Sequence, residues 1–465
     1  MLEAIEARLR AAGLVLSSTW STDVSNWGDD VRLYREYAEG EHRAKLTKEM
    51  REMLRISDSR NDQFSINYCD LVIERMSDRL TVEKIEGNTE EASAWSANVL
   101  EFNRFDALNM DVHGAAIRDG STFVMVAYDN DEQMPITAHE LAWDGDTGTI
   151  PIYDRMGKRM VAAVKVWYEG ETTRRVNIYF ADHVEKFVYG GDGQALNKSE
   201  QFLDEQWVDV NYRAVGVPVV AFVNRAKAKL TTGKSEIAGV IPLNDALNRT
   251  LVSMVMTSEL SAFSIIVLIG AMIKTTYLTP GMILKIAEEG LSKDQQVSVS
   301  RLDQASPVPF IAQAQFIIEQ IGTVSQTPLP GQMGGDSSSG EALKQRESGL
   351  LGKLKRFQVK GGNAWEDVIG MAARVQNAFG RASAPKSARW VCRWADAEIR
   401  NDAEVVKNVK EMRELMGDEQ ALREVAGVFG WDEIQIQKIL TQKRGQMASA
   451  LSALNVPGFD QFAMN

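Results

Sequence analysis

The first quarter of the chain carries apolar residues at the three- and four-residue spacing of amphipathic helices. The first such stretch ends near Gly40 and contains Trp27, Val31, Tyr34 and Tyr37. The same spacing predicts further helices over residues 67–80, 91–102 and 105–118. Cys69 falls on the apolar side of the first of these, so we expect it to be a small core residue.

The period of the pattern then changes to two. Alternating apolar and polar residues begin at Ser121 and predict a meander of antiparallel strands, which a buried strand at 217–223 closes. The other predicted strands are 121–128, 136–141, 150–154, 160–168, 174–180 and 183–189. Helices followed by antiparallel strands predict an α+β fold, and the whole chain is predicted to be predominantly helical.

Helical spacing returns in the second half of the chain. One helix is predicted at 241–260, a second at 309–326 and a much longer one at 341–378. Between the first two, residues 262–308 combine an apolar run, a Thr-Pro-Gly turn and a strand-like stretch. Residues 379–465 predict a linker followed by short helices.

The long helix contains glycines, among them Gly349, Gly352, Gly361 and Gly362. Each weakens a helix by ~1 kcal/mol relative to alanine, so other contacts must hold this helix straight. We expect those contacts to come from neighbouring subunits.

Residues 327–340, TPLPGQMGGDSSSG, interrupt the helical pattern. With two prolines and four glycines, this stretch continues neither a helix nor a strand. A plain flexible linker is the alternative interpretation, because Gly/Ser composition alone indicates only flexibility.

Composition narrows the class of protein. Hydrophobic content of 44% and charged content of 25% are typical of a soluble globular protein, and the net charge of −12 argues against a sequence-specific DNA-binding protein. Two cysteines without a CxxC motif fit a reducing compartment without structural zinc. The charged N-terminal helix differs from a signal peptide, and the apolar run near 265–273 is shorter than the ~20 residues of a bilayer span, so we expect no membrane segment.

One short motif resembles a phosphate-binding loop. Thr232-Gly233-Lys234-Ser235 matches its last residues, but the required glycine five positions earlier is Ala228. A basic connector before a helix is the favoured interpretation. The glycine-serine stretch at 331–340 lacks a GK[ST] ending and follows no strand, so nucleotide binding is disfavoured there too.

No residue pattern predicts an enzyme, a metal site or a cofactor. The histidines lie on separate predicted elements without ligand spacing on one helix face; they are His42, His113, His139 and His183. Four aspartates cluster near turns, where turn chemistry explains them better than a metal; they are Asp129, Asp131, Asp144 and Asp146. No nucleophile elbow, activated cysteine or paired-carboxylate signature occurs.

The start of the long helix is locally basic. Residues 341–360 contain six basic and two acidic residues. The basic residues are Lys344, Arg346, Lys353, Lys355, Arg356 and Lys360. A solvated helix face and a contact surface for phosphate both remain open as interpretations.

The order of these features resembles the portal proteins of tailed bacteriophages, in the branch built from wing, stem, clip and crown regions. The resemblance covers roughly residues 25–378 and rests on several short motifs in order. These are Tyr34-x-x-Tyr37-x-x-Gly40, Asn67, Asp78-Arg79-Leu80-Thr81-Val82, Ile117 to Val124, Ser235-Glu236-Ile237, Pro242 to Thr250, Thr327-Pro328, Ser339 to Lys344, and Trp365.

The resemblance implies a division of the subunit into regions. The implied regions are a wing at 1–234, a stem helix at 235–261, a clip at 262–308, a second stem helix at 309–326, a tunnel loop at 327–340, a long helix at 341–378 that returns into the wing, and a crown at 379–465.

It also implies a role. Such proteins form a ring of about twelve subunits at one capsid vertex, assembled in the host cytoplasm and retained in the virion. The implied partners are double-stranded DNA passing non-specifically through the channel, the terminase large subunit, a head-completion or adaptor protein, scaffold and the major capsid protein.

Two groups of site residues follow from this resemblance. The tunnel-loop group lines the DNA channel and comprises Thr327, Pro328, Gly331, Gln332, Met333, Gly334, Gly335, Asp336, Ser337, Ser338, Ser339, Lys344 and Arg346. The clip group lies at a subunit interface and comprises Ile265, Ile266, Val267, Leu268, Lys285 and Lys293.

Two rival classes stay open from the sequence. A nucleotide-dependent motor subunit is disfavoured by the missing phosphate loop. A structural assembly protein without a DNA channel is the other alternative.

Overall fold

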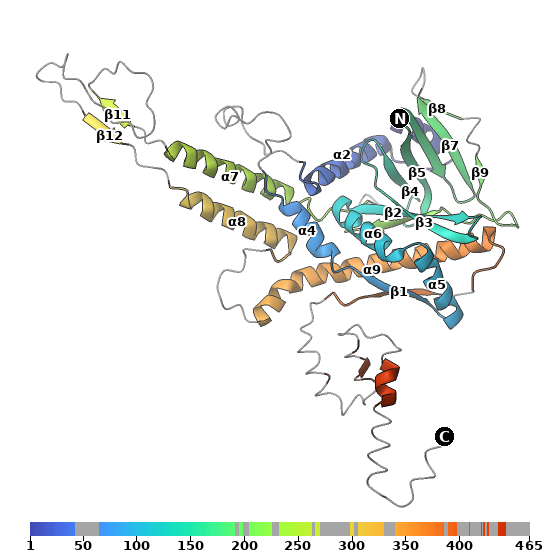
Figure 1. Ribbon diagram of the computed structural model, residues 1–465. Coiled ribbons are helices and arrows are strands. Elements are labelled where there is room, and N and C mark those ends of the chain that lie inside the picture. Colours follow the sequence, from blue (N-terminus) through green and yellow to red (C-terminus); the bar gives the residue numbers. More distant parts are fainter. Residues whose placement is uncertain are drawn as a thin grey trace, which may run out of the picture. The chain divides into compact units, whose positions relative to one another are not determined.

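The computed structural model describes most of the chain up to residue 397 and short pieces beyond it (Figure 1). The described residues are 1–41, 65–190, 195–198, 204–225, 232–262, 266–269, 298–301, 306–329, 340–385, 389–397, 409, 420, 422–423, 426 and 436–442. The chain divides into two compact units, Met1–Ala397 and Glu398–Asn465.

The helices predicted in the first part, including the one at the N-terminus, are confirmed. They are α1 (Leu2–Ala11), α2 (Trp20–Ala38), α4 (Tyr68–Ser77), α5 (Glu90–Phe102) and α6 (Phe105–Asp119). Polar caps define two of their starts. The Asn67 side chain accepts from Cys69 N at 3.0 Å, and the Thr89 hydroxyl accepts from Ala92 N at 3.2 Å. Cys69 is fully buried, as predicted.

The strands form two antiparallel sheets, so the single meander was wrong. One sheet has the order β10-β2-β3, and the other has the order β4-β5-β6-β7-β8 with β9 paired to β7. Their bounds are β2 Ser121–Asp129, β3 Met134–Glu140, β4 Gly148–Tyr153, β5 Met160–Glu169, β6 Thr173–Tyr179, β7 His183–Gly190, β8 Ala195–Asn197, β9 Glu205–Gln206 and β10 Val219–Val223.

The chain changes sheets between Glu140 and Gly148, where α2 contacts the connecting segment. Arg35 on α2 donates to the Ala142 carbonyl at 2.9 Å and to the Asp144 carboxylate at 2.8 Å. These contacts hold the connecting segment against α2. Asp144 also accepts from the Asp146 and Thr147 amides, which confirms its predicted turn role.

A third sheet was not predicted. It is the antiparallel pair of β1 (Val82–Gly87) and β13 (Trp390–Trp394), which joins the start of the chain to a segment expected to be linker. Trp390 packs against Trp95 of α5 with ring centroids 5.8 Å apart.

Two helices of the second half lie side by side. They are α7 (Ile241–Ala262) and α8 (Val308–Ser325) (Figure 1). Of the segment between them, the structure describes an antiparallel pair, β11 (Ile266–Ile269) with β12 (Ser298–Arg301). Among the described residues, no helix is long and apolar enough to cross a membrane.

The long helix α9 (Gly340–Phe379) is continuous, as predicted (Figure 1). Its own chain packs closely on it, so contacts within one subunit help to hold it straight, and contacts from neighbouring subunits stay a prediction. A Cβ at Gly361 or Gly362 would lie 3.4 or 3.0 Å from the Trp394 ring of β13, so these glycines allow that ring to sit against the helix.

The core of the Met1–Ala397 unit has two parts. The first surrounds Trp365 of α9, which contacts the rings of Phe105 and Phe222 with centroids 4.8 and 4.6 Å away. The second lies under the β4–β8 sheet and includes Trp143 and Ile150. The first part therefore fixes α9 to α6 and β10, and so positions the junction with α7 and α8.

Candidate functional site

The candidate site is the junction of α7, α8 and α9, which holds both ends of the predicted tunnel loop. Thr327 and Leu329 are buried directly after α8, and α9 begins at Gly340. Residues 330–339 lie outside the described part of the chain.

A Schellman turn ends α8. The Thr327 amide donates to the Gly322 carbonyl at 3.1 Å and the Gln326 amide donates to the Thr323 carbonyl at 3.3 Å. Gln326 takes the left-handed conformation, φ 52°, where glycine is usual. This conformation costs a non-glycine residue roughly 1 kcal/mol, so neighbouring contacts must hold it.

One of these contacts comes from α9. A Cβ at Gly349 would lie 3.2 Å from the Gln326 Cβ, so glycine lets the end of α8 approach the helix backbone. Glu347 lies on the same helix, and its carboxylate accepts from the guanidinium of Arg79, just after α4, at 2.9 Å. The first turns of α9 are thus tied to both α4 and α8.

The centre of the junction is a buried ion pair between Lys353 of α9 and Glu236. Lys353 Nζ also donates to the Ser325 carbonyl at the end of α8, at 2.7 Å. The other Glu236 oxygen accepts from Asn224 Nδ2 at 3.0 Å, and Arg225 lies 3.2 Å from the carboxylate. The Lys353 cation lies at the C-terminal end of α8, where it also interacts favourably with the dipole of that helix.

The environment keeps Glu236 ionised. Burial alone would raise the pKa of its carboxyl, but the Lys353 charge and hydrogen bonds from Lys353 and Asn224 outweigh burial and lower it. Burial lowers the pKa of Lys353, and the charge of Glu236 opposes that shift. The pair is therefore a charged clamp between α8, α9 and the segment before α7.

The start of α7 is fixed by two buried asparagines. Asn248 accepts from the Ile66 amide at 2.7 Å and donates to the Ile66 carbonyl at 3.0 Å. Asn244 accepts from the Tyr68 amide at 3.0 Å. Both asparagines belong to the Pro242–Thr250 motif, whose role here is to hold the chain before α4.

A third side chain of that motif reaches α2. The Tyr37 hydroxyl donates to Asp245 Oδ1 at 2.6 Å, and Asn67 donates to the Tyr37 carbonyl at 2.8 Å. The early aromatic motif and the α7 motif, far apart in sequence, therefore meet in one hydrogen-bonded group.

The phosphate-loop look-alike has a different role. The Gly233 amide donates to Ser121 Oγ at 2.7 Å, and the Lys234 amide donates to the Asn224 carbonyl at 2.8 Å. A Cβ at Gly233 would lie 1.7 Å from the Gly120 carbonyl oxygen. The glycine is needed for close backbone approach, and the amides that would bind phosphate already have partners.

Among the other candidate residues, His113 and Asp129 have structural roles. His113 is buried, with Nδ1 at 2.8 Å from the Leu80 carbonyl oxygen and Nε2 accepting from Trp365 Nε1 at 2.9 Å. Asp129 accepts from the Asp131 and Glu132 amides, which is turn chemistry. His139 lies on β3, His183 on β7, and His42 outside the described residues. No group of three possible metal ligands occurs among residues that the structure describes.

Of the tunnel-loop group, the structure describes few side chains. Thr327 and Pro328 follow α8, while Lys344 and Arg346 belong to α9 by their backbone alone. Gly331, Gln332, Met333, Gly334, Gly335, Asp336, Ser337, Ser338 and Ser339 lie outside the described residues. Of the clip group, Ile266, Val267 and Leu268 form part of β11, while Ile265, Lys285 and Lys293 lie outside.

Sequence reasoning missed the clamp, although a signal was present. Lys353 stands at helical spacing within the apolar stripe of Leu350, Leu354 and Phe357, which are all buried. A single cation on a buried stripe requires a buried partner. The remaining basic residues nearby, Lys355, Arg356 and Lys360, are exposed.

Comparison with known proteins adds one positive finding. The profile of a family described as "Phage portal protein, SPP1 Gp6-like" matches residues 30–448. None of the curated proteins matches the chain. The matched span includes every element of the junction.

Proposed function

This chain belongs to the SPP1 Gp6-like family of phage portal proteins, and on that premise we propose that it forms a homo-oligomeric ring of about twelve subunits at one capsid vertex. In the virion, double-stranded DNA passes through the ring during packaging and ejection. The terminase large subunit docks on it first and a head-completion protein later. Assembly with scaffold and major capsid protein takes place in the host cytoplasm. The family is structural, so no catalytic step is assigned.

The division into regions is part of the proposal. The pair of α7 and α8 suits the stem, and the β11–β12 pair suits the clip at 262–308. The helices and sheets of residues 1–234 suit the wing, into which α9 returns. Residues 327–340 form the tunnel loop and 379–465 the crown, and within the latter range β13 pairs with β1 of the wing.

The observation that supports the ring best is the outer face of α8. This helix has a single charged residue, Glu319, in 18 residues. Along its exposed side, Val308, Ile311 and Phe316 are 65%, 45% and 59% exposed. Several large apolar side chains exposed on one helix mark an interaction surface, so a neighbouring subunit covers them.

The charges suit a conduit for DNA. A subunit of net charge −12 repels phosphate overall, which prevents tight binding of the passing duplex. Basic residues on α9, with Lys344 and Arg346 nearest the loop, supply weak contacts with the backbone that do not depend on sequence.

The clip carries the second subunit contact of the proposal. Residues 265–268 are a run of apolar residues too short to cross a membrane. At the narrow end of the ring they lie between neighbours, with Lys285 and Lys293 nearer the surface. An Ile266→Asp variant then loses rings, because an unpaired charge is buried.

Electron microscopy and light scattering of the purified protein test the proposal. The expected result is a ring with a central hole whose mass is a fixed multiple of the 51.7 kDa chain. A stable monomer at all concentrations contradicts the assembly. A ring without a central hole supports an assembly protein but excludes the DNA channel.

A further inference from the structure

A rigid turn at 208–214 presents two apolar side chains to solvent. The Asp209 carboxylate accepts from the Asn211 and Arg213 amides at 2.8 and 2.9 Å, and the Tyr212 amide donates to the Asp209 carbonyl at 2.9 Å. At its tip Val210 is 84% and Tyr212 is 88% exposed. The turn is therefore ordered before it meets any partner, which lowers the entropy cost of binding.

The base of the turn is anchored on α9. Trp207 donates to the Gly216 carbonyl at 2.8 Å, and its ring packs on Phe379 with centroids 4.9 Å apart. Phe379 is the last residue of α9. The tip thus projects from a fixed point at the end of that helix.

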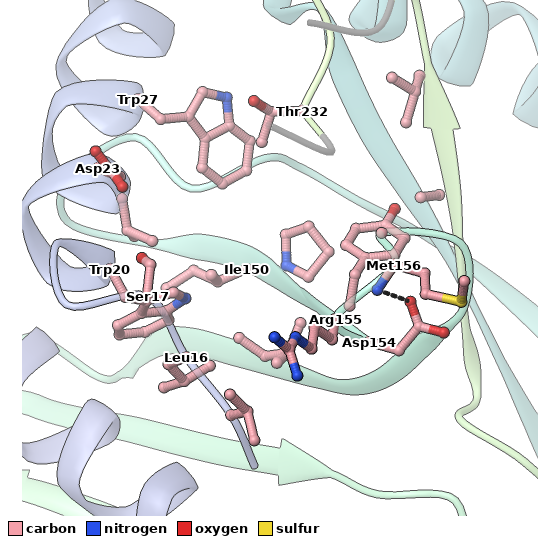
Figure 2. Close-up of a pocket in the computed structure, with 18 of the residues that line it drawn as sticks. Leu16, Ser17, Trp20, Asp23, Trp27, Ile150, Asp154, Arg155, Met156 and Thr232 are labelled. Atoms are coloured by element: carbon pink, nitrogen blue, oxygen red, sulfur yellow. Dashed lines mark hydrogen bonds between the residues drawn. The ribbon is translucent and has the colours of Figure 1, made fainter. Parts of the chain in front are cut away.

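A groove of about 920 Å³ lies elsewhere on the same unit. Figure 2 shows side chains from α2, from β4 and from the turn after β4 lining one space. Its walls include Trp20, Trp27, Ile150 and Tyr153. Val15 and Met156 stand at its rim, and each is 77% exposed. A hollow with aromatic and aliphatic walls can receive an apolar side chain together with the residues beside it.

The turn and the groove hold the four most exposed large apolar side chains of the described residues. These are Tyr212 and Val210 on the turn, and Val15 and Met156 on the groove. Single exposed apolar residues are common on protein surfaces. Two exposed apolar side chains together, as on the turn and again at the groove, indicate an interface. Tyrosine is also a frequent anchor of binding energy.

Neither surface carries a net charge that would repel the other. The turn carries Arg213 and Asp209, and the groove carries carboxylates at Asp23 and Asp154 and cations at Arg155 and Lys360. The apolar side chains therefore supply the contact, and the mixed charges form a polar rim.

The two surfaces are separate patches. The turn is anchored at Phe379, whereas the groove meets α9 at Lys360 and Asn363. Sixteen residues of helix separate Phe379 from Asn363, which is about 24 Å. One subunit therefore cannot fill its own groove with its own turn. In a ring, each copy gives its turn to one neighbour and receives the turn of the other neighbour in its groove.

We propose that the 208–214 turn of one copy inserts Tyr212 into the groove of the next copy, with Met156 closing over it. Such a head-to-tail contact between different patches generates a closed ring when the rotation closes. This inference rests on the ring proposed above and assigns one of its subunit contacts.

Cysteine cross-linking tests the contact. A Met156→Cys/Tyr212→Cys double variant should give, after mild oxidation, a ladder of cross-linked species up to the full ring on a non-reducing gel. A mixture of the two single variants should give dimers at most, because each chain then has one reactive end. The two native thiols should not form cross-links, because burial raises the pKa of both Cys69 and Cys392 to about 12 and so disfavours the reactive thiolate.

A matched pair provides the control. Met110 is 59% exposed on α6, away from the groove lining, so Met110→Cys with Tyr212→Cys should give no ladder. As an independent readout, Tyr212→Asp should raise the concentration at which rings dissociate at least tenfold. Since Tyr212 is 88% exposed, the variant should fold normally.

The outcomes separate this inference from the proposed function. Intact rings without a ladder overturn the turn-to-groove contact and leave the portal ring standing. A ladder that ends in open chains supports the contact and contradicts the closed portal ring. If the protein gives neither rings nor a ladder, both the turn-to-groove contact and the portal ring are wrong.

Discussion

At the scale of single residues, the charge of Lys353 determines how the junction is held. Its ammonium satisfies both the Glu236 carboxylate and the last carbonyls of α8. Lys353 is 7% and Glu236 4% exposed, so water cannot replace either partner. The residue thus matters through its partners in the protein and not as a contact for DNA.

Replacing Lys353 by methionine should destabilise the protein by about 3 kcal/mol, because a buried carboxylate loses its main partner. Arg225 and Asn224 retain part of the compensation. The Glu236→Leu/Lys353→Met double variant should be more stable than Lys353→Met alone. Thermal unfolding measures both. Lys355→Met, on the same helix but exposed, is the control and should change stability by less than about 0.5 kcal/mol.

His113 links stability to pH. Burial lowers its pKa to about 4, although the Leu80 carbonyl opposes this shift. The unfolded state therefore takes up a proton below about pH 6.5 that the folded state refuses. The histidine contribution to stability should fall by about 3 kcal/mol as pH drops from 6.5 to 4, and be constant above 6.5.

A His113→Gln variant tests this linkage. Glutamine keeps a donor and an acceptor but does not titrate, so the difference in melting temperature between wild type and variant should change between pH 6.5 and 4. A difference that stays flat over this range shows that His113 is not the group responsible.

At the scale of elements, the structure explains how α9 tolerates its glycines. Gly349 admits the end of α8, and Gly361 and Gly362 admit Trp394. Gly352 is different, because it is exposed and a Cβ there would meet nothing within 4 Å. Gly352 therefore carries the cost of glycine without a packing reason.

The Gly352→Ala variant should therefore be more stable than wild type by up to ~1 kcal/mol. Gly362→Ala should show no gain or a loss, since its Cβ would lie 3.0 Å from the Trp394 indole nitrogen. Melting temperatures of the two variants, compared side by side, check the assignment. Equal gains at both positions contradict it.

Elements with a long periodic pattern were predicted well from the sequence. The three helices α7, α8 and α9 differ from their expected ends by one or two residues. The β1–β13 pair was missed because VEKIEG and WVCRW are short and lie about 300 residues apart, so neither has a local pattern that indicates a partner. The change of sheet after Glu140 was missed because no strand pattern reveals the contact of the connecting segment with Arg35 of α2.

The site shows the same limit. Pro328 and the glycines after it predicted where the helix ends, because proline and glycine act through the local backbone. The ion pair of Lys353 with Glu236 joins residues 117 positions apart, and the hydrogen bond from Asn248 to Ile66 joins residues 182 positions apart. Such pairs are visible only once the fold brings them together.

At the scale of the whole molecule, the exposed side of α8 is the surface through which we propose that the chain assembles. Phe316 is 59% exposed, so its replacement removes little from the fold of one subunit. In a ring the same side chain is covered by the neighbour, and a charge there is buried without a partner. This difference separates folding from assembly in one experiment.

Phe316→Glu should leave the melting temperature of the monomer unchanged and abolish rings in light scattering. Val359→Glu is a suitable control, because Val359 is 63% exposed on α9 and outside the α8 face. Rings of normal size from Phe316→Glu mean that another surface holds the subunits together.

The two ends of the tunnel loop are anchored independently of its middle. Leu329 is buried after α8, and Lys353 and Gly349 fix α9 against that helix end.

Deleting Gly331 to Gly335 therefore removes none of the described contacts, and the variant should form rings like the wild type. If the loop surrounds the DNA in the channel, the same rings should package or retain less DNA. A Lys344→Glu variant should show a defect that depends on salt, because phosphate contacts weaken as salt rises. Normal packaging and retention by the deletion variant in normal rings exclude a role for this loop in handling DNA.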